Sequence, residues 1–220
     1  MTEPMRVALT FDAEHPDRPN DGDTTPQILA ALAAVGARAT FFIQGRWAEA
    51  FPELAASIAE AGHLVGNHSF YHARLPVLNG DGLATDVRSS EEVIRSVTGH
   101  DPQPWFRAPF GSGANRADLV QALQGLGYRH IGWHIESNEW EPGRTPDQIH
   151  RSVVDGAMAH GDGAIALLHT WPRPVAPALP RILADLGANG ASFVGVDQLD
   201  LPPGLEPVGE PRPADIRAAS

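Results

Sequence analysis

Residues 63–72 read His63-Leu64-Val65-Gly66-Asn67-His68-Ser69-Phe70-Tyr71-His72, an apolar run followed by two histidines four positions apart. The run is typical of a short buried strand. If the segment after it turns helically, His68 and His72 share one face and their imidazoles converge on one metal ion. α/β enzymes carry such sites at the carboxyl ends of strands, so this segment favours an α/β fold with a metal site. The alternative is two surface histidines in one helical turn.

The rest of the chain alternates between strand-like and helix-like segments. The strand-like runs are residues 7–11, 39–43, 63–66, 105–107, 128–133, 164–168 and 192–196. Helical patterns, many with an N-terminal cap or a C-terminal glycine, cover residues 24–35, 52–61, 86–97, 115–126, 145–159 and 179–186. Strict alternation predicts a parallel sheet covered by helices. Seven such units without a Gly-x-Gly-x-x-Gly turn favour a barrel over a dinucleotide-binding sheet.

The chain shows no internal repeat and no linker that would divide it. We therefore predict a single catalytic domain over residues 1–200. Residues 201–220 are rich in proline and are predicted to form an irregular C-terminal tail.

Composition narrows the classes of function. A formal net charge of −11 over 220 residues argues against a nucleic-acid-binding surface. The absence of cysteine excludes disulfides and thiolate ligands, so a metal must be held by His, Asp or Glu. No apolar run approaches the length of a membrane span. The first six residues lack the features of a signal peptide, which predicts a cytoplasmic protein, although a secreted chain trimmed of its leader would look the same.

Polar side chains end or follow five of the predicted strands. In a parallel barrel these strand ends open on one face, the face that carries active sites. A single charged residue there has a simpler explanation as a loop charge or a helix cap, but five strands that each deliver one indicate a site. The residues are Asp12, His68, His72, Arg107, Glu136, Glu139 and His169.

Five short motifs run through the chain in order. They are Thr10-Phe11-Asp12, His68-Ser69-Phe70-Tyr71-His72, Arg107-Ala108-Pro109-Phe110-Gly111, Trp133-His134-Ile135-Glu136-Ser137-Asn138-Glu139-Trp140 and Leu167-Leu168-His169. In this order and spacing the chain resembles the polysaccharide deacetylases, the fourth carbohydrate esterase family, from about Val7 to Val196. Its fourth motif has Glu139 where that family usually has Asp.

The resemblance implies a fold, an activity and a cofactor. The fold would be an incomplete (β/α)7 barrel of the TIM type. The activity would be hydrolysis of N-acetyl groups on sugars of chitin or peptidoglycan type, so the expected partner is a carbohydrate substrate. The cofactor would be a divalent metal, usually zinc, with cobalt or another divalent ion as alternatives. The resemblance leaves the exact sugar and the oligomeric state open.

The resemblance also implies four catalytic roles. Asp12 would be the general base, and Arg107 would pair with it and keep it ionised. His169 would be the general acid that protonates the departing amine, and Glu139 would orient and charge-stabilise His169.

Three further residues are implied around the acetyl group. The backbone N–H of Phe110 would stabilise the oxyanion, and Trp140 and Leu167 would wall the pocket for the acetyl methyl. Ordinary core packing is the alternative for Trp140 and Leu167. Trp171, on the expected rim, would suit sugar stacking or packing equally.

One departure from the family concerns the third metal ligand. The family usually reads Thr-Phe-Asp-Asp, with the second Asp on the metal, whereas Ala13 stands at that position here. We hypothesise that Glu14 replaces it and binds the metal with His68 and His72. The alternative is that Glu14 is a solvated loop residue and the metal has two protein ligands or is absent. The reserve candidates are His15 and Asp17.

Two other functions compete with sugar deacetylation. One is hydrolysis of a small non-sugar C–N bond, because the family includes allantoinase-like members. The other is a catalytically inactive, sugar-binding relative, which Ala13 supports. The presence of Asp12, Arg107 and His169 argues against the inactive relative, since binding alone needs no base, base partner and acid.

Overall fold

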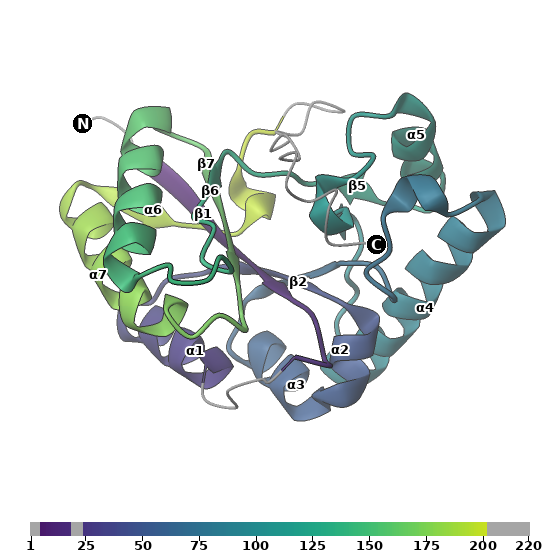
Figure 1. The fold of residues 1–220 in the computed structure, drawn as a ribbon, viewed down its shortest axis with the longest axis horizontal. Coiled ribbons are helices and arrows are strands. Elements are labelled where there is room, and N and C mark those ends of the chain that lie inside the picture. The colour runs from purple at the N-terminus through teal and green to yellow at the C-terminus, as the bar shows by residue number, and fades with distance from the viewer. Residues whose placement is uncertain (1–4, 19–23, 202–220) are drawn as a thin grey trace.

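A computed structural model describes residues 5–18 and 24–201 of the chain (Figure 1). Its centre is one sheet in which every strand pair is parallel and β1 occupies the middle. The sheet order is β5-β4-β3-β2-β1-β7-β6, and β8 pairs with the beginning of β1. The strands are β1 (Met5–Ala13), β2 (Thr40–Ile43), β3 (Leu64–Asn67), β4 (Trp105–Phe106), β5 (Arg129–His130), β6 (Ile135–Glu136), β7 (Ala164–His169) and β8 (Ala191–Phe193).

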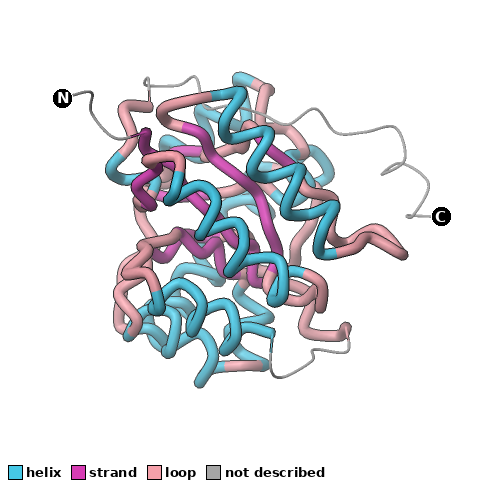
Figure 2. The backbone as a smooth tube through the Cα atoms, turned by 90° about the vertical axis from the view of Figure 1, so that its left-hand side faces the viewer, coloured by secondary structure: helices cyan, strands magenta, loops and turns pink. Residues whose placement is uncertain are grey.

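Helices cover the outside of this sheet (Figure 2). In Figure 1, α6 and α7 lie beside β7 and β6, while α4 and α5 lie at the other end of the sheet. The helices are α1 (Thr24–Ala34), α2 (Gly45–Ala50), α3 (Pro52–Glu60), α4 (Gly80–Thr98), α5 (Ala117–Gly125), α6 (Pro146–His160) and α7 (Val175–Ala188), with short 3-10 turns η1 (Leu75–Val77), η2 (Pro109–Gly111) and η3 (Val196–Gln198). None of these helices has both the length and the apolar character of a membrane span.

The sheet is an open half-barrel. Within the described residues β5 and β6, its two end strands, pair on one side only, so the barrel does not close. This confirms the predicted incomplete (β/α) barrel. The predicted C-terminal tail falls, from residue 202 on, outside the described residues.

The fifth predicted strand, residues 128–133, is wrong in its extent. Only Arg129–His130 pairs with β4, and the chain then crosses to the other end of the sheet and forms β6, which contains Glu136. The carbonyls of Ile131 and Gly132, where the chain crosses, accept hydrogen bonds from the guanidinium of Arg107. The side chain of Arg107 thus donates the hydrogen bonds that a neighbouring strand would otherwise donate. Because the predicted strand divides into β5 and β6, the sheet has eight strands instead of the predicted seven.

Three helices also differ from the prediction. The helix α4 begins at Gly80 instead of residue 86. The helix α2 was not predicted, and α7 begins at Val175 instead of residue 179 although it contains Pro180. Proline removes one helical hydrogen bond, which made an earlier start unfavourable from sequence. The apolar face of α7, which includes Leu179 and Ile182, is fully buried, and this packing outweighs the lost bond.

The side chains of β1 alternate between two cores. Val7, Leu9, Phe11 and Ala13 are fully buried in the core beneath the helices, whereas Ala8 belongs to a second core inside the half-barrel. This alternation is the period of two that every strand imposes on its side chains. It also sets which residues of β1 can reach the open end of the half-barrel.

Candidate active site

The end of β1 delivers two carboxylates to the same side of the sheet. Asp12 lies an even number of residues after Ala8 along β1, so its side chain leaves the strand on the same side and points into the half-barrel. The side chain of Ala13 points the other way, into the helix-side core. Glu14, two positions after Asp12, returns to the inner side and is buried. Glu14 is the first residue after β1, and the alternation of the strand continued by one residue places its carboxylate on the inner side, whereas Ala13 faces the helices.

Glu14, His68 and His72 come together as predicted. The Oε2 atom of Glu14 lies 3.2 Å from His68 Nε2 and 2.5 Å from His72 Nε2. The two imidazole Nε2 atoms are 3.2 Å apart. All three side chains are almost inaccessible to solvent. Among the described residues they form one of two groups of three that can hold a metal ion, the other being Asp12, Glu14 and His169.

The donor set fits a divalent metal. His68 Nδ1 donates to the carbonyl oxygen of Arg107 at 2.9 Å, so Nε2, which faces Glu14 and His72, is the ring nitrogen that would bind a metal ion after losing its proton. Two histidine nitrogens on a tetrahedral zinc ion lie about 3.3 Å apart, close to the 3.2 Å between these two rings. The 2.5 Å contact of His72 with Glu14 is a short hydrogen bond, whose proton a metal ion would displace.

The turn that joins the two histidines is not helical, so they converge without the helical turn that the sequence reasoning took as the condition for it. Ser69 and His72 adopt left-handed φ angles of 66° and 57°. Side chains hold this conformation, because Asn67 Oδ1 accepts from the N–H of Ser69 at 2.9 Å and Ser69 Oγ accepts from the N–H of His72 at 3.0 Å. The rings converge through a tight turn fixed by these bonds, which offset the cost of the strained angles.

Asp86 holds this turn from α4, a role that sequence reasoning missed. Its two carboxylate oxygens each accept one backbone N–H at 3.0 Å, from Phe70 and from Tyr71. Asp86 is buried and lies one residue from Val87 on the apolar face of α4. An acidic side chain on the buried face of a helix is the signal that would have pointed to it.

Replacing Asp86 with asparagine is expected to weaken zinc binding about tenfold to a hundredfold, the usual effect of losing an outer partner of a metal site. Asparagine offers one acceptor oxygen and turns its NH2 group toward the second backbone N–H, so the turn loosens. The affinity is measured by competition with a chromophoric chelator. Asp118→Asn, at an exposed carboxylate, is the matched control. Equal zinc affinity in the wild type and Asp86→Asn would contradict a positioning role.

Asp12 and Arg107 form a buried ion pair as predicted. Arg107 is fully buried, and its NH1 group donates to Asp12 Oδ1 at 2.9 Å and to the hydroxyl of Thr10 at 2.8 Å. Its remaining donors reach the two backbone carbonyls at the strand crossing. The guanidinium thus makes four hydrogen bonds. The other oxygen of Asp12, Oδ2, lies 3.5 Å from His68 Nε2, beside the metal cluster.

His169 and Glu139 form a second pair on the opposite flank of the cluster. His169 Nδ1 lies 2.7 Å from Glu139 Oε1, and the hydroxyl of Ser137 donates to Glu139 Oε2 at 2.5 Å. The other ring nitrogen, Nε2, faces Glu14 at 3.8 Å. Burial alone would lower the pKa of His169, but Glu139 first, then Glu14 and Asp12, outweigh it and raise this pKa to about 9.

This elevated pKa predicts how the stability of the metal-free chain depends on pH. The folded state holds the His169 proton up to about pH 9, whereas the unfolded chain releases it near 6.5. The stabilisation is therefore complete below pH 6.5 and is lost as the pH rises to 9, by an amount on the order of 3 kcal/mol. Urea unfolding at pH 6 and pH 9.5 measures it. Glu139→Gln is expected to flatten the difference, and an equal loss in both proteins would contradict the pairing.

Glu14 has further neighbours at the outer side of the cluster. His15 Nε2 lies 2.9 Å from Glu14 Oε1, and the indole N–H of Trp171 donates to the same oxygen at 3.3 Å. Burial alone would raise the pKa of Glu14, yet His72, then His15 and His68, hold it well below its usual range. The reserve candidate His15 thus lies at the site, whereas Asp17 is exposed and pairs with Arg46.

The residues predicted around the acetyl group lie near the site in different ways. Phe110 has a left-handed φ of 60°, and its ring stands edge-on to His72 with centroids 4.5 Å apart. Leu167 is buried in the core inside the half-barrel, together with Trp133. Trp140 is half-buried directly after Glu139. Only Phe110 of the three has a direct contact with a candidate metal ligand described above.

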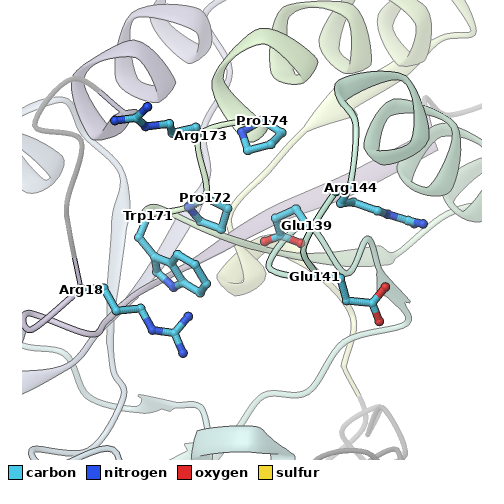
Figure 3. Close-up of a pocket in the computed structure, with 9 residues that line it drawn as sticks. Arg18, Glu139, Glu141, Arg144, Trp171, Pro172, Arg173 and Pro174 are labelled. Carbon is cyan, nitrogen blue, oxygen red and sulfur yellow. The ribbon is translucent and has the colours of Figure 1, made fainter.

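A pocket of about 330 Å³ opens beside the site (Figure 3). Its wall includes Glu139 and Trp171, the two residues that link it to His169 and Glu14. Figure 3 shows the indole of Trp171 between Arg18 and Pro172, with Glu139 across the pocket. The lining residues are Arg18, Glu139, Glu141, Gly143, Arg144, Trp171, Pro172, Arg173 and Pro174.

Three proteins are similar to this chain in sequence or in fold. Peptidoglycan-N-acetylmuramic acid deacetylase PdaA of Bacillus subtilis is 28% identical over 198 residues, which cover 90% of this chain and 72% of that protein. Peptidoglycan-N-acetylglucosamine deacetylase of Bacillus cereus is 32% identical over 192 residues, covering 86% of this chain and 66% of that protein. A CE4 family pseudoenzyme from Bacillus anthracis superposes with a TM-score of 0.77 at 26% identity, covering 90% of this chain and 65% of that one.

The family model for polysaccharide deacetylase matches residues 1–131, more than half of the chain. This span contains the first three of the five motifs, which carry Asp12, the histidine pair and Arg107. The half-barrel, the five motifs and the family match agree: this chain belongs to the polysaccharide deacetylase family.

Proposed function

We propose that the protein is a metal-dependent hydrolase that removes N-acetyl groups from N-acetylated sugars or their oligomers and polymers. One observation carries the proposal. A possible metal cluster of Glu14, His68 and His72 is flanked on one side by Asp12, held by Arg107, and on the other by His169, held by Glu139. A base and an acid with a Lewis acid between them are together sufficient to hydrolyse an amide.

Asp12 serves as the base. Its Oδ1 accepts a hydrogen bond from Arg107 NH1 at 2.9 Å. Its Oδ2 lies beside the cluster, 3.5 Å from His68 Nε2, and is the atom that takes a proton from the attacking water. The pair with Arg107 fixes the direction of that oxygen, because the buried guanidinium is itself held in place by three further hydrogen bonds.

His169 serves as the acid. Its Nδ1 proton points to Glu139, so the proton on Nε2 is the one available for the departing amine. Because the pKa of His169 is raised to about 9, the ring carries that proton at neutral pH. Glu139 is one methylene longer than the family's usual Asp, and it still reaches His169 at 2.7 Å.

The cofactor is a divalent metal held by Glu14, His68 and His72, and zinc is the ion we propose. When bound there, the ion supplies Lewis-acid chemistry, acidifying water and polarising the acetyl carbonyl. Imidazole and carboxylate donors suit zinc, and cobalt accepts the same donors. The backbone N–H of Phe110 stabilises the oxyanion, and Trp140 and Leu167 wall the space for the acetyl methyl.

Acetate release tests this function. The zinc-loaded protein is incubated with N-acetylglucosamine oligomers and with peptidoglycan glycan strands, and acetate is assayed enzymatically. We expect release from at least one sugar, abolished by a chelator and restored by zinc. Release of acetate from no sugar, together with hydrolysis of a small non-sugar amide, would instead support the allantoinase-like alternative.

The inactive sugar-binding relative is the second candidate, and two observations favour it. Ala13 removes the family's usual ligand, and a pseudoenzyme shares the fold. The position of Glu14 supports the active enzyme, because it supplies a carboxylate at the cluster in place of the missing one. A cytoplasmic location and a single domain over residues 1–200 stay predictions.

A further inference from the structure

The two oxygens of the Glu14 carboxylate face different partners. Oε2 is turned toward the two imidazoles, 3.2 Å from His68 Nε2 and 2.5 Å from His72 Nε2. Oε1 lies 2.9 Å from His15 Nε2 and accepts from the indole N–H of Trp171 at 3.3 Å. A carboxylate oxygen accepts along two lone pairs, so these two donors fill both directions at Oε1. Oε2 is therefore the oxygen that remains for a metal ion.

His15 has an unusual backbone conformation beside Glu14. Its φ angle of 60° is left-handed, which a residue other than glycine keeps only when its surroundings enforce it. Its N–H donates to Gln44 Oε1 at 2.9 Å, and its carbonyl oxygen accepts from the N–H of Arg18 at 3.1 Å. Gln44 also donates to the carbonyl oxygen of Phe70, in the turn between the two histidines, at 3.2 Å. These bonds fix the backbone of His15 and join it to the histidine turn.

Trp171 reaches the same oxygen from the loop after β7. The guanidinium of Arg18 lies over its indole, 4.2 Å from the ring centroid (Figure 3). The indole also meets the ring of His15 edge-on, with centroids 5.9 Å apart. The two donors to Oε1 thus pack against each other, and contacts on the indole hold its N–H toward Glu14.

A longer side chain needs more support as a metal ligand. Ala13 stands where the family usually has aspartate, and Glu14 has one more rotatable bond than an aspartate. A free glutamate therefore loses more conformational freedom when it binds an ion. A glutamate whose second oxygen is already bonded has its rotamer set before the ion arrives, which removes part of this cost.

We propose that His15 and Trp171 are positioning residues that clamp Oε1 of Glu14 and so make Glu14 a one-oxygen ligand of the metal ion. The inference rests on the metal site of the proposed function and deepens it, because the clamp allows a glutamate to replace the family's aspartate. Both residues act through Glu14, and neither binds the ion. The alternatives are that His15 is itself a ligand and that the two rings only pack against the site.

Two substitutions remove the donors and keep the local shape. Trp171→Phe keeps an aromatic ring and removes the N–H. His15→Asn removes the imidazole and suits the left-handed backbone, which asparagine tolerates. Each is expected to weaken zinc binding about tenfold, the lower end of the range for outer partners of a metal site, in competition with a chromophoric chelator. The matched controls are His100→Asn, at an exposed histidine after α4, and Trp105→Phe, at a half-buried indole on β4. Both should bind zinc as the wild type does.

The cobalt(II)-loaded protein gives a readout that a loss of packing alone does not move. With the clamp in place, Glu14 contributes one oxygen. Without it, Oε1 is free to bind as well, and the coordination number rises. The visible absorption of cobalt(II) weakens as four ligands become five or six, because it depends on the ligand geometry. At saturating cobalt both variants should therefore absorb less per bound ion, while the controls keep the wild-type spectrum.

A double-mutant cycle tests whether the clamp acts through Glu14. In the Glu14→Ala background the acceptor is gone, so Trp171→Phe should lower the affinity for zinc no further. The same loss in both backgrounds would show that Trp171 acts by packing, and would overturn the clamp. A loss above about a hundredfold in His15→Asn with none in Trp171→Phe would identify His15 as a ligand and overturn it as well.

Failure of the clamp and failure of the proposed function give different results. Zinc and cobalt binding do not depend on acetate release, so a protein that binds metal but hydrolyses no sugar still tests the clamp. Wild-type affinity and a wild-type spectrum in both variants would overturn the clamp and leave the proposed hydrolysis standing. A wild type that binds neither ion would overturn the metal site and the clamp together.

Discussion

Replacing Glu14 with glutamine lowers the affinity for zinc by more than about a hundredfold, because an outer partner of a metal site alone is worth tenfold to a hundredfold. Glutamine keeps the shape of the side chain but loses the negative charge that faces both imidazoles at Oε2. Its single acceptor oxygen can serve either the two imidazoles or the pair of His15 and Trp171, but not both. Zinc content after dialysis and a chelator competition titration measure the loss.

Asp17→Asn is the control for this result. Asp17 is an acidic residue of the same loop, but it is exposed and pairs with Arg46 instead of with the cluster. The two variants thus remove one negative charge each from neighbouring positions. Thermal unfolding without metal shows whether Glu14→Gln still folds. Unchanged zinc occupancy in a folded Glu14→Gln protein would remove Glu14 from the site and bring His15 forward as the third ligand.

The second large effect is expected from Asp12→Asn, which should lower kcat for acetate release by about 10²- to 10⁴-fold, the range for loss of a general base. The asparagine oxygen can still accept from Arg107 NH1, so the side chain keeps its position while losing its basicity. Zinc binding should persist, because Asp12 is not among the three proposed ligands. Steady-state kinetics on the best sugar substrate give the ratio.

Asp12→Asn also decides between the enzyme and the inactive relative. Acetate release by the wild type that vanishes in the variant excludes a protein that only binds sugar. Equal release by both would show that the base lies elsewhere. Arg107 loses its ionic partner in this variant, and a broken buried pair costs about 3–5 kcal/mol. Asp12→Ala, which leaves Arg107 without an acceptor there, should be less stable than Asp12→Asn, and a urea titration compares them.

The ends of the strands can be predicted from the sequence, because strands appear as short apolar runs and the catalytic residues come directly after them. The first strand, the histidine pair and His169 could be placed from apolar runs and from the charged residues after them. Glu14 could be proposed as a ligand from its nearness to Asp12, and its geometry follows from the period of two along β1. These features depend on local spacing, which the sequence contains directly.

Other features depend on contacts between distant segments and could not be predicted. The split of the fifth predicted strand arises because Arg107 bonds to the carbonyls of Ile131 and Gly132, 24 and 25 residues away. The shape of the histidine turn depends on Asp86, which reaches back from the next helix. Neither hydrophobic periodicity nor helix-capping residues indicate such bonds, because the partner residues become neighbours only after folding.

The packing of Ala13 limits where a carboxylate can stand beside the two imidazoles. An aspartate introduced at that position would place a carboxylate in the helix-side core among Phe11 and Ile43, where burying an unpaired charge is strongly unfavourable. A single substitution there therefore does not restore the family's usual metal carboxylate. Ala13 and Glu14 are in this way not interchangeable positions, because their side chains leave the backbone on opposite sides of the sheet.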